Sequence, residues 1–156
     1  MFYEALDKYG DLNALGFKRQ GKWEHVSYSQ YYLIARKVAK GFLKLGLERA
    51  HSVAILGFNS PEWFFSAVGT VFAGGIVTGI YTTSSPEACQ YIARDCRANI
   101  IVVDTQKQLE KILKWPGDAY VPQLHPEACE VRQVSLHSRG EFRWIYWLGS
   151  DFEDVT

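Results

Sequence analysis

Short apolar runs alternate with helical patterns along the first part of this chain. Three such runs occur, at residues 51–57 (HSVAILG), 76–81 (IVTGIY) and 99–104 (NIIVVD). Near-continuous apolar runs are typical of strands that are buried on both faces of a parallel sheet. After each run comes a residue suited to cap a helix, namely Ser60, Ser85 and Thr105. The alternation of strand and helix predicts an α/β fold, part of a doubly wound parallel sheet with right-handed crossovers.

A hairpin and a long helix are predicted before these runs. Residues 14–27 alternate around Gln20-Gly21, a plausible two-residue turn between two strands. Ser27 and Gln30 then have the spacing of a capping box, and apolar residues recur at helical intervals. Gly46 fits the position just after the end of this helix.

The basic residues of this helix fall largely off its apolar stripe. They are Arg36, Lys37, Lys40 and Lys44. Two interpretations stay open: an ordinary solvated face, or a patch that contacts anionic lipid headgroups.

No charged residue occurs between Glu62 and Glu87, a stretch close to the length of a membrane span. Four glycines and several hydroxyl residues interrupt it, and Gly74-Gly75 lies where a helix would stop. We therefore predict a buried helix over 61–73 followed by a buried strand, and no transmembrane span. The helix is apolar around most of its circumference, which favours neighbours on several sides.

The hydroxyl run at residues 81–85 (YTTSS) has the layout of a phosphate-binding turn, because it joins a strand to a helix N-terminus. However, it contains neither glycine nor lysine. Its Ser85-Pro86-Glu87 sequence repeats Ser60-Pro61-Glu62, where a helix cap is a sufficient explanation. Glu87 also takes the position that an anion would favour. We interpret the run as a strand-to-helix turn.

Other candidate chemistry is sparse. The sequence has no P-loop, no Gly-x-Gly-x-x-Gly after a strand, no Gly-x-Ser-x-Gly and no His-Glu-x-x-His. Asp95 and Asp104 lie near element ends and suit capping or surface roles, and His25 and His51 suit structural or solvent-facing ones. We therefore predict no catalytic, cofactor-binding or metal-binding residue.

The three cysteines fit buried thiols in a reduced, cytosolic compartment. Cys89 and Cys96 are seven residues apart on a predicted helix and share a face. The alternative, a metal site formed by His125, Cys129 and His137, fits no zinc spacing.

Composition changes sharply near Lys114. The chain has 17 basic and 17 acidic residues, a balance that gives no indication of nucleic-acid binding. All nine lysines precede Trp115, whereas three of the five prolines and three of the five tryptophans follow Lys114. We predict a first domain over 1–114 and a divergent tail over 115–156, either irregular or disordered, or containing two strands joined at Gly140.

The first part of the chain resembles the N-terminal subdomain of bubblegum-type long-chain acyl-CoA synthetases. The phrases HSVAILGFNSPEW and GGIVTGIYTTSS carry this resemblance most specifically, and it extends over about residues 2–114. It implies the fold of the adenylate-forming enzymes, which activate a fatty acid with ATP and Mg²⁺ and pass the acyl group to coenzyme A. It also implies a cytoplasmic protein, with peripheral contact to the endoplasmic reticulum membrane as an open alternative.

The departures from the family pattern concern its catalytic motifs. The YTSGTTGxPKG phosphate loop, the adenine and ribose motifs and the lysine-bearing C-terminal domain are absent. We therefore expect a truncated or alternative product that binds no cofactor and is catalytically incompetent alone. Three strands of a larger sheet would also leave an edge uncovered, which predicts marginal stability. Two alternatives stay open: a module that binds the full-length synthetase, or a small independent nucleotide- or lipid-binding protein.

Overall fold

The computed structural model describes residues 2–115, 123–124, 131–135 and 143–147 of the 156-residue chain. The helices are α1 (Phe2–Tyr9), α2 (Tyr28–Lys44), α3 (Pro61–Phe72), α4 (Pro86–Asp95) and α5 (Gln106–Leu113). The strands are β1 (Asn13–Arg19), β2 (Lys22–Ser27), β3 (Ser52–Leu56), β4 (Ile76–Ile80), β5 (Ala98–Val103), β6 (Gln123–Leu124), β7 (Val131–Ser135) and β8 (Arg143–Trp147). Strands β1 and β2 form a separate hairpin, and the other six form one sheet in the order β4-β3-β5-β8-β7-β6.

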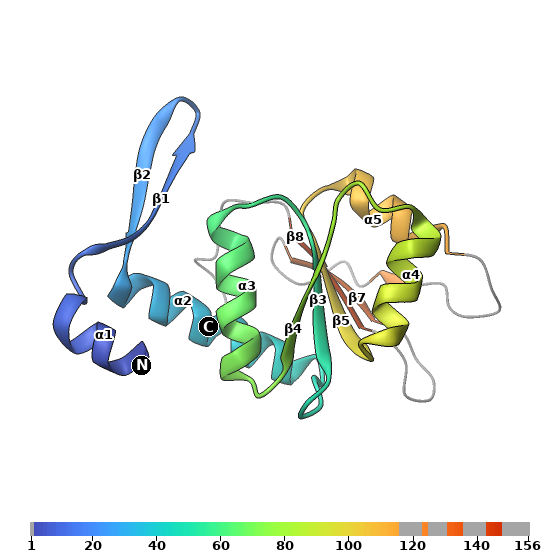
Figure 1. Ribbon diagram of the computed structural model, residues 1–156, viewed down its shortest axis with the longest axis horizontal. Helices are drawn as coiled ribbons and strands as arrows, with labels where there is room; N and C mark the ends of the chain where they lie inside the picture. The colour runs from blue at the N-terminus through green and yellow to red at the C-terminus, as the bar shows by residue number, and fades with distance from the viewer. Residues whose placement is uncertain (1, 116–122, 125–130, 136–142, 148–156) are drawn as a thin grey trace.

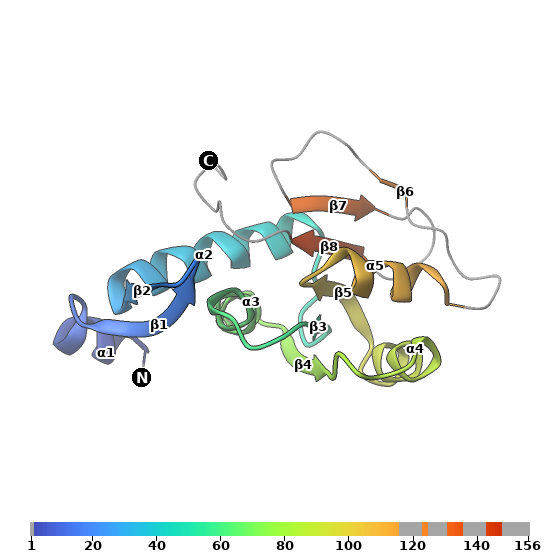
Figure 2. The ribbon, with the colours of Figure 1, turned by 90° about the horizontal axis from the view of Figure 1, so that it is seen from above.

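The predicted α/β fold is confirmed. Strand β3 pairs in parallel with β4 on one side and with β5 on the other. Its side chains alternate between two buried clusters, so Val53 and Ile55 contribute to one and Ala54 and Leu56 to the other. Helices α2 and α3 cover the first face, while α4 and α5 cover the second (Figure 1, Figure 2).

The predicted helix caps are also confirmed. The hydroxyls of Ser60, Ser85 and Thr105 accept the backbone N–H groups three residues further on, at 3.2, 3.2 and 3.4 Å. Each satisfies a donor that the first turn of a helix leaves unpaired. Ser27 and Gln30 form the expected reciprocal capping box at the start of α2.

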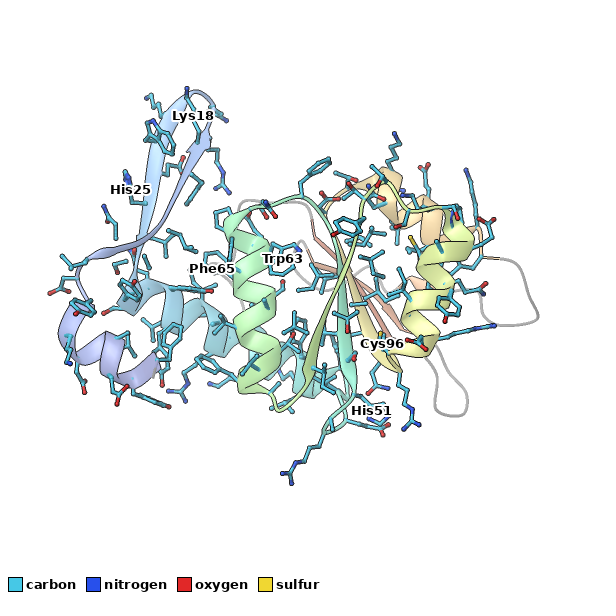
Figure 3. All side chains as sticks on the ribbon, in the orientation of Figure 1. Lys18, His25, His51, Trp63, Phe65 and Cys96 are labelled. Atoms are coloured by element: carbon cyan, nitrogen blue, oxygen red, sulfur yellow. The ribbon has the colours of Figure 1, made fainter. Side chains whose placement is uncertain are left out.

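The hairpin turns where the sequence predicted. Gln20 and Gly21 both have positive φ, 47° and 82°, as the first and second central residues of a two-residue hairpin turn require. The hairpin projects from the body, with Lys18 near its tip and His25 on the second strand (Figure 3). It is tied to α3 through Arg19, whose guanidinium donates to Glu62 at 2.9 Å.

Helix α1 was not predicted from the sequence. It packs through Phe2, whose ring contacts Tyr31 and Phe72 at centroid distances of 5.6 and 5.5 Å, both edge-on. These contacts join three separate helices, and such packing stabilises a helix of only eight residues.

Helix α3 buries one aromatic residue, Phe65, beside three small ones. Ser66, Gly69 and Thr70 lie on the covered side, while Phe64 and Val71 are 43% and 61% exposed. The buried hydroxyl of Thr70 donates to the Ser66 carbonyl at 2.8 Å, so its burial leaves no unpaired polar group. The small side chains allow α3 to approach α2 closely, since a β-carbon added to Gly69 would meet the Val38 side chain.

The tail contributes strands to the sheet. Strand β8 pairs in parallel with β5, and β7 pairs with β8 in antiparallel orientation. Of the two interpretations of the tail, the one with two strands is therefore correct for 131–135 and 143–147. The sheet continues past β5 through β8, and among the described strands the uncovered edge beside the three predicted strands lies at β4. Gly140 lies outside the described residues.

Candidate functional site

The carboxyl ends of β3, β4 and β5 meet at one edge of the sheet, at the top in Figure 1. Ligands of open α/β sheets bind at this edge, where neighbouring strands lead to helices on opposite faces. Strand β3 leads to α3 on one face, and β5 leads to α5 on the other. The crevice between β3 and β5, together with the turn after β4, is therefore the candidate site.

Asp104 closes the crevice between β3 and β5. Its Oδ2 atom accepts the backbone N–H of Phe58 at 2.9 Å. A β-carbon on Gly57 would lie 3.0 Å from the Asp104 β-carbon, so glycine permits this close approach. The other carboxylate oxygen, Oδ1, is buried and has no hydrogen-bond partner among the described residues. This contact ties the end of β5 to the turn after β3, and it is not a helix cap, because Phe58 precedes Ser60, the cap residue of α3.

The space that remains in this crevice is small. It forms a cavity of about 20 Å³, lined by residues of the β3–α3 turn, by the side of α3 and by the end of β5. A cavity of this size accommodates about one water molecule.

The turn at Tyr81–Ser85 presents carbonyl oxygens to a lysine. The ammonium group of Lys111 donates to the Thr82 carbonyl at 2.7 Å and to the Ser84 carbonyl at 2.8 Å. The side-chain amide of Gln108 also donates to Thr82, at 3.4 Å. A phosphate-binding turn instead directs backbone N–H groups at its ligand. In the observed contacts, the carbonyl oxygens of the turn accept from a cationic donor and from an amide.

The lysine at this turn is not evident from local sequence patterns. Lys111 lies on α5, and it is separated from Thr82 by 29 positions. No local spacing relates the two residues. They meet because α4 and α5 cover the same face of the sheet, which places the start of α4 beside the last turn of α5.

Glu87 occupies the N-terminus of α4. Hydrogen bonds from its own backbone N–H and from the Ser85 hydroxyl lower the pKa of its carboxyl group. The helix end thus already holds a negative charge, as the sequence led us to expect.

The thiols behave as small apolar groups. Cys89 is fully buried, and burial raises the pKa of its thiol, so it is not activated as a nucleophile. Its Sγ lies 3.8 Å from the Ser84 carbonyl oxygen. Cys96 is partly buried and packs against the same core cluster, which agrees with the shared face that was predicted.

The remaining candidates do not converge on this edge. Figure 3 places His51 and Cys96 at the opposite end of the sheet and His25 on the projecting hairpin. Asp95 is the last residue of α4, next to Cys96. Within the described part of the chain, no cluster of three or more His, Cys, Asp or Glu residues could hold a metal ion. His125, Cys129 and His137 lie outside the described residues.

Comparison with known proteins settles the family. A profile of the AMP-binding enzyme family matches residues 2–141. The chain belongs to this family. The match passes Lys114, and β8 from beyond Lys114 pairs with β5, so the domain boundary at Lys114 stays a prediction.

Two relatives show the similarity within the family. The long-chain-fatty-acid–CoA ligase ACSBG1 of Rattus norvegicus is 92% identical over 114 residues, which cover 73% of this chain and 16% of the relative. The long-chain-fatty-acid–CoA ligase ACSBG2 of Xenopus laevis is 60% identical over 159 residues, with 99% and 21% covered. The resemblance to bubblegum-type synthetases is thus confirmed, and the chain spans between a sixth and a fifth of these relatives' length.

A solved structure shows the same fold. The crystal structure of the anthranilate CoA ligase AuaEII in complex with anthranoyl-AMP matches with a TM-score of 0.64 and 31% identity. The match covers 71% of this chain and 20% of that one. The matched part of this chain therefore has the fold of about a fifth of that solved ligase.

The uncharged stretch around α3 was the only membrane-span candidate in the sequence. Among the helices of the described residues, none combines the length and apolar character needed to cross a bilayer.

Proposed function

We propose that this chain carries a sheet-forming, N-terminal part of a long-chain fatty acid–CoA ligase and does not catalyse ligation by itself. The observation that supports this most directly is the 92% identity to rat ACSBG1 over 114 residues. In the parent enzyme, ATP and Mg²⁺ would activate a long-chain fatty acid as the acyl-adenylate. Coenzyme A would then accept the acyl group, with release of AMP.

The polar groups at the candidate site bind other parts of the same chain, and this supports the proposal that the isolated chain is inactive. Adenylation requires cationic groups or a metal ion placed at the phosphate that is attacked. At the carboxyl edge, Lys111 is engaged by the Thr82 and Ser84 carbonyls, and Asp104 is engaged by the Phe58 backbone. These residues stabilise turns. Among the described residues, they do not form a set of groups that could bind the fatty acid and the nucleotide for reaction.

The test is a coupled assay for AMP release with ATP–Mg²⁺, a long-chain fatty acid and coenzyme A. Full-length rat ACSBG1 is the positive control. We expect AMP release at the rate of the enzyme-free blank from the isolated chain; turnover above the blank would contradict the proposal. Isothermal titration with ATP–Mg²⁺ examines the binding step separately, and micromolar binding would show that a nucleotide site persists without catalysis.

The exposed side of α2 supports peripheral contact with a membrane from the cytoplasm as a second candidate role. Arg36, Lys40 and Lys44 are exposed on this helix, and the exposed Leu33 and Leu43 accompany them. Basic and apolar side chains together suit the surface of an anionic bilayer. Flotation with phosphatidylserine vesicles, and with uncharged phosphatidylcholine vesicles as control, tests this role. Binding that does not depend on lipid charge, or no binding, would contradict it.

A further inference from the structure

The cavity between β3 and β5 has polar as well as apolar walls. The oxygen-bearing side chains that line it belong to Ser60, Glu62, Ser66 and Asp104. The first three lie at the start and along the side of α3, and Asp104 follows directly after β5. Apolar cavities stay empty, whereas polar cavities of sufficient size hold water. The walls of this cavity therefore have the chemistry that a bound polar molecule requires.

Asp104 supplies an acceptor that lacks a donor among the described residues. Its Oδ2 atom accepts the backbone N–H of Phe58 at 2.9 Å, while its Oδ1 atom is buried and has no hydrogen-bond partner there. An ionised carboxylate can only accept hydrogen bonds. Because an unpaired buried acceptor is unfavourable, such atoms are generally bonded to the protein or to ordered water. The group that pairs with Oδ1 must therefore be a donor.

Helix α3 brings hydroxyl groups to the same cavity. The Ser60 hydroxyl accepts the backbone N–H of Trp63 at 3.2 Å, and this bond does not use the hydrogen of the hydroxyl. Ser66 is only 4% exposed and also lines the cavity. A hydroxyl can both donate and accept a hydrogen bond. A small molecule in the cavity can thus donate to Asp104 and also bond to a serine of α3.

We propose that this cavity binds one water molecule, which donates a hydrogen bond to Asp104 Oδ1 and bonds to the hydroxyl of Ser66. The volume of about 20 Å³ suits a single water molecule. A water that bridges two buried polar groups is nearly as favourable as a direct hydrogen bond between them. This water joins the end of β5 to α3 across the end of β3. Together with the Phe58–Asp104 bond, it holds the turn between β3 and α3 in place.

The cavity favours water over a metal ion. Calcium takes about six to eight oxygen ligands, and magnesium usually keeps several of its own waters. Of the two carboxylates at the cavity, that of Glu62 is already paired with Arg19 at 2.9 Å. Within the described ranges, no group of three or more His, Cys, Asp or Glu residues could hold a metal ion. A volume that suits one water molecule also leaves no room for a hydrated ion.

Magnetic relaxation dispersion of water oxygen tests the proposal in solution, because its amplitude reports the number of long-lived waters in a folded protein. The 156-residue chain is compared with Ser66→Val, in which a larger side chain without a hydroxyl takes up the cavity. We expect the amplitude to fall by the contribution of one water molecule. Equal amplitudes in the parent chain and in this variant would overturn the proposal.

Thr70→Val is the matched control for this variant. Thr70 is also a buried hydroxyl residue of α3, but it is not one of the residues that line the cavity. We expect its variant to keep the amplitude of the parent chain, and circular dichroism confirms that both variants are folded. Treatment of the parent chain with EDTA, and replacement of sodium by tetramethylammonium, should leave the amplitude unchanged. A fall after either step would assign the site to a cation and overturn the proposal.

A crystal structure of the parent chain tests the position of the water without any substitution. We expect one density peak at a hydrogen-bond distance of about 2.7 to 3.2 Å from Asp104 Oδ1, and at a similar distance from the Ser66 hydroxyl. An empty cavity, or an Oδ1 atom that is bonded directly to a protein donor, would overturn the proposal.

Discussion

Gly69 of α3 lies so close to Val38 of α2 that a β-carbon added to it would come within 2.6 Å of the Val38 Cγ1 atom. The same added carbon would lie 3.1 Å from the Ala35 carbonyl oxygen. The two helices therefore cross at a point where only glycine fits. This crossing joins α3 to α2 on one face of the sheet.

We predict that Gly69→Ala destabilises the fold, despite the better helix propensity of alanine. Overpacking costs about 1 to 3 kcal/mol, whereas the propensity gain is only about 0.5 to 1 kcal/mol. Urea unfolding should show a net loss of about 1 to 2 kcal/mol. The cost of Gly69→Ala should be smaller in a Val38→Ala background than in the parent chain, because the Val38 Cγ1 atom that it would meet is then absent.

Gly41→Ala is the matched control for this prediction. Gly41 is also inside a helix, α2, but an added β-carbon there would meet nothing within 4 Å. We expect stabilisation by about 0.5 to 1 kcal/mol. Equal effects of the two alanine substitutions would show that the helix crossing is not tight at Gly69.

The Arg19–Glu62 pair should anchor the hairpin to α3. The side chain of Glu62 is only 14% exposed, and the 2.9 Å contact is a charge-assisted hydrogen bond. We predict that Arg19→Ala increases hydrogen exchange of the β1 and β2 amides and lowers stability by about 1 kcal/mol. The exposed neighbour Lys18→Ala is the control. Unchanged exchange in the Arg19 variant would mean that the hairpin is held by its other contacts.

Lys111 should order the turn at Tyr81–Ser85. Replacement by methionine keeps most of the side-chain volume but leaves the Thr82 and Ser84 carbonyls without their cationic donor. We predict a loss of about 1 to 2 kcal/mol in denaturant unfolding and faster hydrogen exchange in this turn. Lys107→Met, exposed on the same helix, should change neither quantity. A Lys111 variant as stable as the parent would show that these bonds contribute little.

Tyr31 should make stability depend on pH in the alkaline range. Burial raises its pKa from near 10 to about 12, and its hydroxyl donates to the Phe64 carbonyl at 3.2 Å. The folded state thus favours the neutral phenol. This contribution is fully present below pH 10 and is lost as the pH rises through 12, by about 2 to 3 kcal/mol in total.

Comparison with Tyr31→Phe isolates this effect. Phenylalanine cannot ionise, so the difference in unfolding free energy between the parent and the variant should shrink as the pH rises from 10 to 12. A constant difference across this range would contradict the raised pKa. Absorbance of tyrosinate follows the ionisation directly in the same samples.

Sequence patterns predicted much of the fold because the signals are local. Strands β3, β4 and β5, the caps at Ser60, Ser85 and Thr105, and the Gln20-Gly21 turn were all located correctly. Each depends on residues within about four positions, through capping hydrogen bonds, turn conformation or apolar periodicity. The interpretation of residues 81–85 as a turn also depends on local signals, namely the helix cap at Ser85 and the proline after it.

The contacts of the candidate site could not be predicted from local sequence patterns. The Phe58–Asp104 bond joins residues 46 positions apart, and the Lys111 contacts span 27 and 29 positions. Helix α1 depends on ring contacts from Phe2 to α2 and α3. No periodicity in the sequence encodes such pairings, because they arise from which helices cover which face.

Local chemistry therefore specified the elements of this protein, their ends and the family resemblance carried by its apolar strands. Packing specified which side of α3 is buried, that Lys111 reaches the turn after β4, and that β8 rather than solvent borders β5. The physical reason is one of range. Hydrogen bonds of caps and turns link near neighbours, whereas burial links whichever surfaces the folded sheet brings together.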